Sequence, residues 1–177
     1  MNYDVLPAHL PPSETYFPID MITPCENEVF VDGGSFQGDT LPGFSAHWNG
    51  RFHHIFALEP DPQNLIALES KKEELGLTTR MTVLPYALGE KNCQVSFAST
   101  GSVSSQISEH GEQSTSVECR RLDEISWPLT PTYIKMDIEG AEPQAIVGAA
   151  GLLKRDHPIL AACTYHRTEH LWQIPNL

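Results

Sequence analysis

The sequence predicts an α/β domain whose centre is a parallel sheet. Short apolar runs alternate along the chain with segments of helical periodicity, and the first run leads into a glycine-rich turn. This alternation is typical of parallel strands joined by right-handed crossovers, with helices on both faces of the sheet. At 177 residues and 40% hydrophobic content, the chain is long enough for one domain with a core and too short to expect two.

The first 27 residues are interpreted as an irregular lead-in, because prolines interrupt any helix or strand there. These prolines are Pro7, Pro11, Pro12, Pro18 and Pro24. The Tyr16-Phe17 pair of this segment is expected to pack onto the core. The domain itself is expected to span residues 28–177.

The first predicted strand is the apolar run 28–32, which ends in an acid followed by glycines, as a buried parallel strand entering a loop does. Asp39 and Thr40 are expected to cap the helix that follows. Phe44 and Trp48 are four residues apart, so they share one face of that helix.

The second predicted strand, 54–59, also ends in an acid. Asp61 then stands at an N-cap position with Pro62 at the first helical position, which is a typical helix start. The helix is expected to be amphipathic and to lead to a third strand over 81–84.

The second half of the chain continues this pattern after one irregular stretch. Residues 99–116 are rich in serine, threonine and glycine, which predicts a hairpin tip or a mobile loop, either a plain surface loop or a lid over substrate. A fourth strand is expected over 133–137, followed by a helix through Leu153. A fifth strand is expected over 159–165, and a last helix begins near Thr168.

The charge balance excludes two classes of partner. The chain has 11 basic and 23 acidic residues, a net charge of -12, which repels both nucleic-acid phosphates and anionic membrane surfaces. We therefore expect a small-molecule substrate, with neither a nucleic acid nor a membrane as partner.

The cysteines and the N-terminus bear on the cellular compartment. Cys25, Cys93, Cys119 and Cys163 form no C-x-x-C pair, so neither a zinc knuckle nor a disulfide framework is indicated. The first residues lack the basic start and apolar run of a signal peptide, and no stretch has membrane-spanning length. Cytoplasmic residence is expected by exclusion.

The turn over residues 32–40 is the first candidate for cofactor binding. Glycines at a strand-to-helix turn let the backbone approach a ligand. The pattern D-G-G-S-x-x-G lacks the G-x-G spacing of a nicotinamide fingerprint and favours S-adenosylmethionine, although a plain turn is the alternative. The candidate binding residues in this turn are Asp32, Gly33, Gly34, Ser35, Gly38 and Thr40.

Glu59, followed by Pro60, ends the second strand beside this turn. Its carboxylate can accept hydrogen bonds from both ribose hydroxyls of a cofactor, unless it is only a surface carboxylate before a proline turn. Ala87 and Leu88, after the third strand, are expected to flank the adenine ring.

Ionisable residues stand at alternate positions of the fourth strand and predict a catalytic crevice. Lys135, Asp137 and Glu139 would share one face, at the switch point where this strand meets the first. Buried pairing of Lys135 with Asp137 is the structural alternative. His166 closes the fifth strand and is expected to face Asp137 as a proton acceptor, or to be only a hydrogen-bonded filler. Lys135, Asp137 and His166 are the candidate catalytic residues.

A metal site is a second possibility at the same crevice. Asp137 and Glu142 would offer hard oxygen ligands to a divalent ion that lowers the pKa of an acceptor hydroxyl. Spacing in the sequence does not separate this mechanism from a general base.

At these residues the sequence resembles the FkbM family of methyltransferases. The most specific part is the motif YIKMDIEGAE over 133–142. Similarity also covers residues 16–18, 28–34, 38–40, 58–60, 86–89, 165–166 and 171–175. Nearly the whole chain is therefore covered.

The resemblance implies a Rossmann-like methyltransferase fold with strand order 3-2-1-4-5 and two further strands. It also implies O-methylation of hydroxyls on sugars or other secondary metabolites. Because the chain stops soon after the fifth strand, it is expected to lack the last two strands, being truncated or a shortened member. The fifth strand would then keep a free apolar edge, which suggests a homodimer.

These inferences together predict an S-adenosylmethionine-dependent methyltransferase. A substrate oxygen would displace the methyl group in line, with most of the rate coming from positioning. Two other classes stay open, an NAD-dependent dehydrogenase and a catalytically silent nucleotide-binding module.

Overall fold

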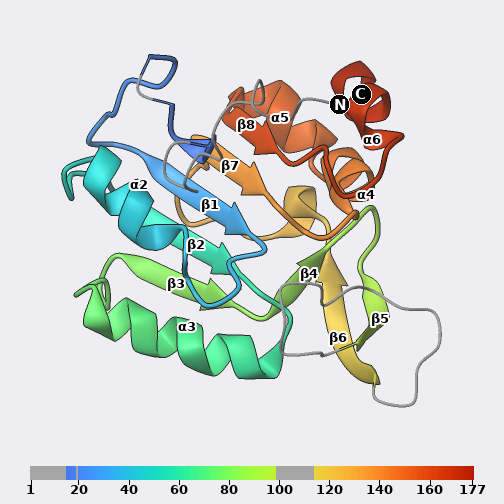
Figure 1. Cartoon of the computed structure of the whole chain (residues 1–177), viewed down its shortest axis with the longest axis horizontal. Coiled ribbons are helices and arrows are strands. Elements are labelled where there is room, and N and C mark those ends of the chain that lie inside the picture. Colours follow the sequence, from blue (N-terminus) through green and yellow to red (C-terminus); the bar gives the residue numbers. More distant parts are fainter. Residues whose placement is uncertain (1–14, 19, 99–113) are drawn as a thin grey trace, which may run out of the picture.

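A five-stranded parallel sheet forms the centre of the molecule, described here by a computed structural model that covers residues 15–18, 20–98 and 114–177 (Figure 1). Its strand order is β3-β2-β1-β7-β8. The strands are β1 (Val29–Gly33), β2 (His54–Leu58), β3 (Met81–Leu84), β7 (Tyr133–Met136) and β8 (Ile159–Ala162). Counting only these parallel strands along the chain, the order is 3-2-1-4-5, so the predicted fold is confirmed.

Helices cover both faces of this sheet (Figure 1). They are α2 (Leu41–His47), α3 (Pro62–Glu74), α4 (Glu142–Gly148), α5 (Ala150–Asp156) and α6 (His170–Gln173), with short 3-10 turns at Leu122–Glu124 and Ile174–Asn176. Neighbouring residues of a strand point to opposite faces, so Phe30 packs with α2 and α3 while Val31 packs with α4 and α5. The chain thus has two apolar layers, one on each side of the sheet.

The layer beneath α2 is a cluster of aromatic rings. Phe44 stacks on Phe30 and on Trp48, with ring centroids 4.4 and 4.3 Å apart. Phe17, from the lead-in, makes edge contacts with all three rings and is buried. The expected packing of this part of the lead-in onto the core is therefore confirmed.

A second, three-stranded sheet was not predicted. It consists of β4 (Tyr86–Leu88), β6 (Ser114–Arg120) and β5 (Cys93–Ala98), in that order, with β5 antiparallel to β6. The predicted loop over 99–116 is wrong at its end, because residues 114–116 pair with β5. The backbone groups of these residues form hydrogen bonds with β5, and their polar side chains give no apolar run that would indicate a strand. Residues 99–113 lie outside the described part.

Several boundaries differ from the sequence-based expectation. The helix predicted through Leu153 is two helices, because the backbone leaves helical geometry at Ala149. The fifth strand ends at Ala162 instead of residue 165. Thr40 is the N-cap of α2, but its side chain makes no capping hydrogen bond, whereas Asp61 accepts from the amides of Gln63 and Asn64 as predicted.

The outer side of β8 is an edge, since no strand among the described residues pairs with it. Within the described residues, no helix is both long enough and apolar enough to cross a bilayer.

Candidate active site

The loops that follow β1 and β7 touch at the carboxyl end of the sheet. The amides of Gly34 and Ser35 donate to the carbonyl of Leu58, at 3.0 and 3.1 Å, which ties the first loop to β2. Gly34 has a φ of +73°, and a Cβ on it would lie 1.9 Å from the carbonyl oxygen of Asp137. Only glycine fits there, so the predicted glycine turn serves to bring Asp137 against the first loop.

Lys135 and Asp32 form a buried ion pair beneath this contact. The Lys135 Nζ lies 2.9 Å from Asp32 Oδ1 and donates to the carbonyl of Gly34 at 3.0 Å. Burial alone would lower the pKa of Lys135, but Asp32 and Asp137 outweigh it and raise that pKa. The lysine therefore stays charged. The suggested pairing of Lys135 with Asp137 is therefore wrong, because the ion-pair partner of Lys135 is Asp32.

Glu59 lies at the end of β2, as predicted, and its carboxylate binds the chain itself. It accepts from the amides of Phe36 and Asp61 at 2.8 and 2.9 Å, and from Asn64 Nδ2 at 3.4 Å. Burial raises the pKa of Glu59. The carboxylate thus joins the first loop to the start of α3, and the ribose contact stays a prediction.

The other candidate cofactor residues surround the same loop. Ser35 and Thr40 are buried, and the Ser35 hydroxyl donates to the carbonyl of Asp32 at 2.7 Å. Ala87 and Leu88 lie in β4 and are buried, with Leu88 packed against Gly33. Gly38 has a φ of +82° and Pro60 is half-buried. Nothing in these contacts tests their role toward adenine or the methionine end of a cofactor.

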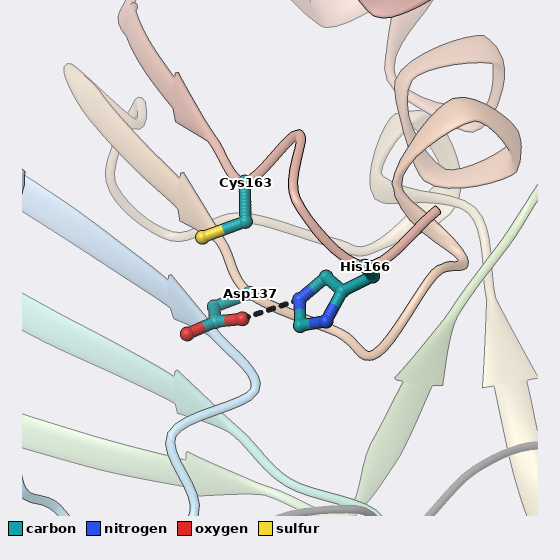
Figure 2. Close-up of side chains that lie close together, drawn as sticks. All are labelled: Asp137, Cys163 and His166. Atoms are coloured by element: carbon teal, nitrogen blue, oxygen red, sulfur yellow. Dashed lines mark hydrogen bonds and ion pairs between the residues drawn. The ribbon is translucent and has the colours of Figure 1, made fainter. Parts of the chain in front are cut away.

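Asp137 and His166 come together, as predicted. The His166 Nε2 lies 2.7 Å from Asp137 Oδ1 (Figure 2). His166 does not close the fifth strand, however, because β8 ends four residues earlier and the following loop carries the ring. The loop joins β8 to α6, and along it the imidazole lies beside the end of β7 (Figure 2).

Two tyrosines complete the surroundings of Asp137. The Tyr16 hydroxyl donates to Asp137 Oδ2 at 2.6 Å, and the Tyr165 hydroxyl lies 3.2 Å from both oxygens. Burial alone would raise the pKa of Asp137, but Lys135 and the hydrogen bonds from Tyr16 and His166 lower it. Asp137 is therefore a carboxylate at neutral pH.

Tyr16, Tyr165 and Cys163 were missed by sequence reasoning. Cys163 directly follows β8, and its sulfur lies 3.3 Å from the Tyr16 hydroxyl. Burial and the charge of Asp137 raise the pKa of this thiol to about 11. The adjacency of Tyr165 to His166 was a usable signal, whereas nothing in the lead-in indicated that Tyr16 reaches the site.

Two more carboxylates border His166. Glu139 Oε2 lies 3.5 Å from its Nδ1, and Glu142 Oε1 lies 3.3 Å from its Nε2. Glu142 is fully buried and accepts from the amide of Ile138 at 2.9 Å. The suggested metal pair of Asp137 and Glu142 is not supported, because the described cluster with metal-ligand spacing consists of Asp137, Cys163 and His166.

Comparisons with known proteins identify the family and the fold. The sequence profile of the methyltransferase FkbM domain matches residues 32–174. The crystal structure of methyltransferase FkbM from Methylobacillus flagellatus KT superposes with a TM-score of 0.77 at 29% sequence identity, covering 94% of this chain and 40% of that one. This chain therefore spans well under half the length of that protein.

A second solved structure is more distant. TrmK of M. capricolum, in complex with S-adenosyl-homocysteine, has a TM-score of 0.39 and 13% identity over 76% of this chain and 42% of its own. That likeness is too weak to place any residue. None of the curated proteins matches the sequence. The profile match over most of the chain establishes that this protein belongs to the family of methyltransferase FkbM domains.

Proposed function

We propose that this domain transfers the methyl group of S-adenosylmethionine to a hydroxyl oxygen of a sugar or another small metabolite. Family membership supports methyl transfer. The observation that carries the choice of oxygen is the pair of Asp137 and His166, 2.7 Å apart at the carboxyl end of the sheet. A carboxylate beside an imidazole can orient a hydroxyl and accept its proton.

The first loop and Glu59 fit the cofactor that the family implies. Ligands of open parallel sheets lie outside the carboxyl ends of the strands, where these residues are. A carboxylate has about four lone-pair sites. Three donors of the chain already point at Glu59, which leaves one site for a ribose hydroxyl. When bound, the cofactor supplies an electrophilic methyl group on a sulfonium sulfur.

The chain's own residues would orient the acceptor and hold its proton. Asp137 stays ionised, so it can accept a hydrogen bond from the incoming hydroxyl while it fixes the imidazole. His166 donates its Nε2–H to ionised Asp137, so Nδ1 is the atom that can take the proton, and Glu139, 3.5 Å from Nδ1, would stabilise the resulting imidazolium. Lys135 would act indirectly, because its ammonium holds the first loop through Asp32 and Gly34. In this scheme most of the rate comes from alignment.

Ligand binding tests the chemical class without a known acceptor. We expect S-adenosylhomocysteine to bind the full chain and raise its melting temperature by mass action, and NAD to leave that temperature unchanged. Glu59→Ala should lose most of the shift, whereas Glu73→Gln, which changes an exposed carboxylate of α3, should keep it. Stabilisation by NAD alone would favour a dehydrogenase.

The same measurement addresses the silent module. S-adenosylhomocysteine binding without any transfer of labelled methyl from S-adenosylmethionine to hydroxyl-bearing metabolites would favour a domain that only binds nucleotide.

We place the protein in the cytoplasm, a proposal supported by four cysteines that are all free thiols.

A further inference from the structure

Three metal-ligating side chains converge at the end of β7 and β8. Asp137, Cys163 and His166 each offer one ligand atom, and these atoms all lie within 4.8 Å of one another. Figure 2 shows them coming from two neighbouring segments, the end of β7 and the loop after β8. We propose that these three residues bind a thiophilic divalent metal ion, with Zn²⁺ as the preferred ion.

The donor set decides which metals fit. A thiolate, an imidazole and a carboxylate are the ligand types of zinc sites, and three protein ligands with one open position are typical of catalytic zinc. Magnesium and calcium prefer oxygen ligands throughout, so sulfur and nitrogen disfavour them.

The distances require only a small rearrangement. Zinc-to-ligand bonds of about 2.0–2.3 Å in a tetrahedron place ligand atoms roughly 3.3–3.8 Å apart. The 2.7 Å contact between His166 Nε2 and Asp137 Oδ1 would open by about 1 Å or less. The Tyr16 hydroxyl, within hydrogen-bond distance of both Asp137 and Cys163, would move or become the fourth ligand.

The surroundings match those of a metal-binding histidine. Such a histidine usually directs its second nitrogen at a carboxylate, which fixes the ring and its tautomer. In His166 the Nδ1 lies 3.5 Å from Glu139 Oε2 while the Nε2 faces Asp137, so with a metal ion at Nε2 the ring proton would be on Nδ1 and directed at Glu139. Glu142 adds a third carboxylate, and Lys135 is already paired with Asp32. The negative charge of these carboxylates therefore favours a cation beside His166.

Metal binding would change how the site handles a proton. Without a metal, His166 donates its Nε2–H to Asp137 and keeps its lone pair on Nδ1. A metal ion at Nε2 would move that proton to Nδ1, beside Glu139, so the imidazole could no longer act as the base. A bound Zn²⁺ would lower the pKa of a hydroxyl or water in its open position, so the metal would replace the imidazole in activating the acceptor. The metal site itself rests on the three side chains and does not depend on methyl transfer.

Cobalt provides the test, because a cobalt–thiolate bond gives a sulfur-to-metal charge-transfer band in the near ultraviolet. The full chain is freed of metal with a chelator and titrated with Co²⁺, then with Zn²⁺. We expect the band to saturate at one ion per chain and Zn²⁺ to abolish it. Cys163→Ser should lose the band and weaken Zn²⁺ binding by at least about tenfold. Cys25→Ser is the matched control, because Cys25 precedes β1 and lies at the other end of the sheet.

Two outcomes would overturn the proposal. One is the absence of a charge-transfer band, and the other is a band that survives in Cys163→Ser and so comes from another cysteine. His166→Gln serves as a second variant and should weaken Zn²⁺ while leaving the thiolate band at higher Co²⁺. S-adenosylhomocysteine binding, measured on the same metal-free protein, reports separately on the proposed function, so failure of one does not imply failure of the other.

Discussion

Two carboxylates lie at opposite ends of the neighbouring strands β1 and β7, and their surroundings differ in kind. Glu28, just before β1, is buried and accepts from Trp48 Nε1 at 3.2 Å and from the Thr132 hydroxyl at 2.5 Å. Glu28 also accepts from the Cys25 thiol at 3.5 Å, and burial raises the pKa of that thiol. None of these donors ionises at neutral pH. At the amino end of the sheet, Glu28 therefore has a structural role.

Asp137, just after β7, is surrounded by a charged lysine, a histidine and two phenol hydroxyls. Lys135 and His166 are near it, and two tyrosine hydroxyls contact it. Glu28 is buried and Asp137 is half-buried, and both are hydrogen-bonded. Hydrogen bonds therefore do not distinguish a structural carboxylate from a functional one, whereas charged neighbours and a partly open side do.

The largest expected effect is on the rate of methyl transfer, which should fall on substitution of Asp137 but not of Glu28. Asp137→Asn should lower methyl transfer by about 10²–10⁴-fold, the usual contribution of a positioned acid or base. Glu28→Gln should leave the rate per folded molecule unchanged. Transfer of labelled methyl to a pool of hydroxyl-bearing metabolites, normalised to the folded fraction by circular dichroism, measures both. Equal losses in the two variants would erase the proposed difference between the ends.

The next effect concerns how tightly each end is packed. Gly34→Ala should lower the free energy of unfolding by about 2–5 kcal/mol, because the new Cβ meets the Asp137 carbonyl and the left-handed backbone is itself costly. Gly76→Ala, where φ is +66° and nothing lies within 4 Å of the new Cβ, should cost only about 1–2 kcal/mol. Urea unfolding measures both. Similar losses of unfolding free energy in the two variants would mean that the loops after β1 and β7 can move apart at little cost.

A smaller effect follows from the lowered pKa of Asp137. Its pKa in the folded chain is below the ordinary 3.8, so ionised Asp137 stabilises the fold above that value. The contribution is lost as the pH falls through the folded-state pKa. The stability advantage of the native chain over Asp137→Asn should therefore be constant near neutral pH and shrink in acid. Gly76→Ala changes no titratable group, and its difference from the native chain should not follow this curve.

The smallest effect is weak self-association through the edge of β8. This strand has no charged residue, and Ile159 at its start is 44% exposed. We expect sedimentation at high concentration to show a dimer that Ile159→Lys removes. Ile66→Lys, on the exposed surface of α3, is the matched control and should not affect it. A native chain that stays monomeric would show that the edge is tolerated.

The central sheet could be predicted because β1 and β2 are apolar runs that end at acids. The run before Asp32 and the run before Glu59 are buried on both sides, so periodicity and termination are both visible in the sequence. The sheet formed by β4, β5 and β6 escaped prediction, because β4 has only three residues and polar residues interrupt any apolar run in β5 and β6. Strand pairing of this kind is set by backbone hydrogen bonds to a partner, which leave little trace in composition.

The candidate site was predicted in part for a similar reason. Asp137 and His166 could be paired because parallel strands end at the same edge of a sheet. The partner of Lys135 could not be assigned, since Asp32 and Asp137 are both acids at the ends of adjacent strands. Tyr16 lay beyond reach, because its contact with Asp137 spans 121 residues and depends on the path of an irregular segment.

The position of Tyr16 also bears on the order in which the protein assembles. Its hydroxyl contacts residues 137 and 163, so these contacts form only after most of the chain has left the ribosome. Contacts so distant in sequence carry the largest entropic cost of closure and tend to form late. The first two strands can pair early, whereas the surroundings of Asp137 must wait. A nascent chain would thus pair β1 with β2 before the contacts around Asp137 form.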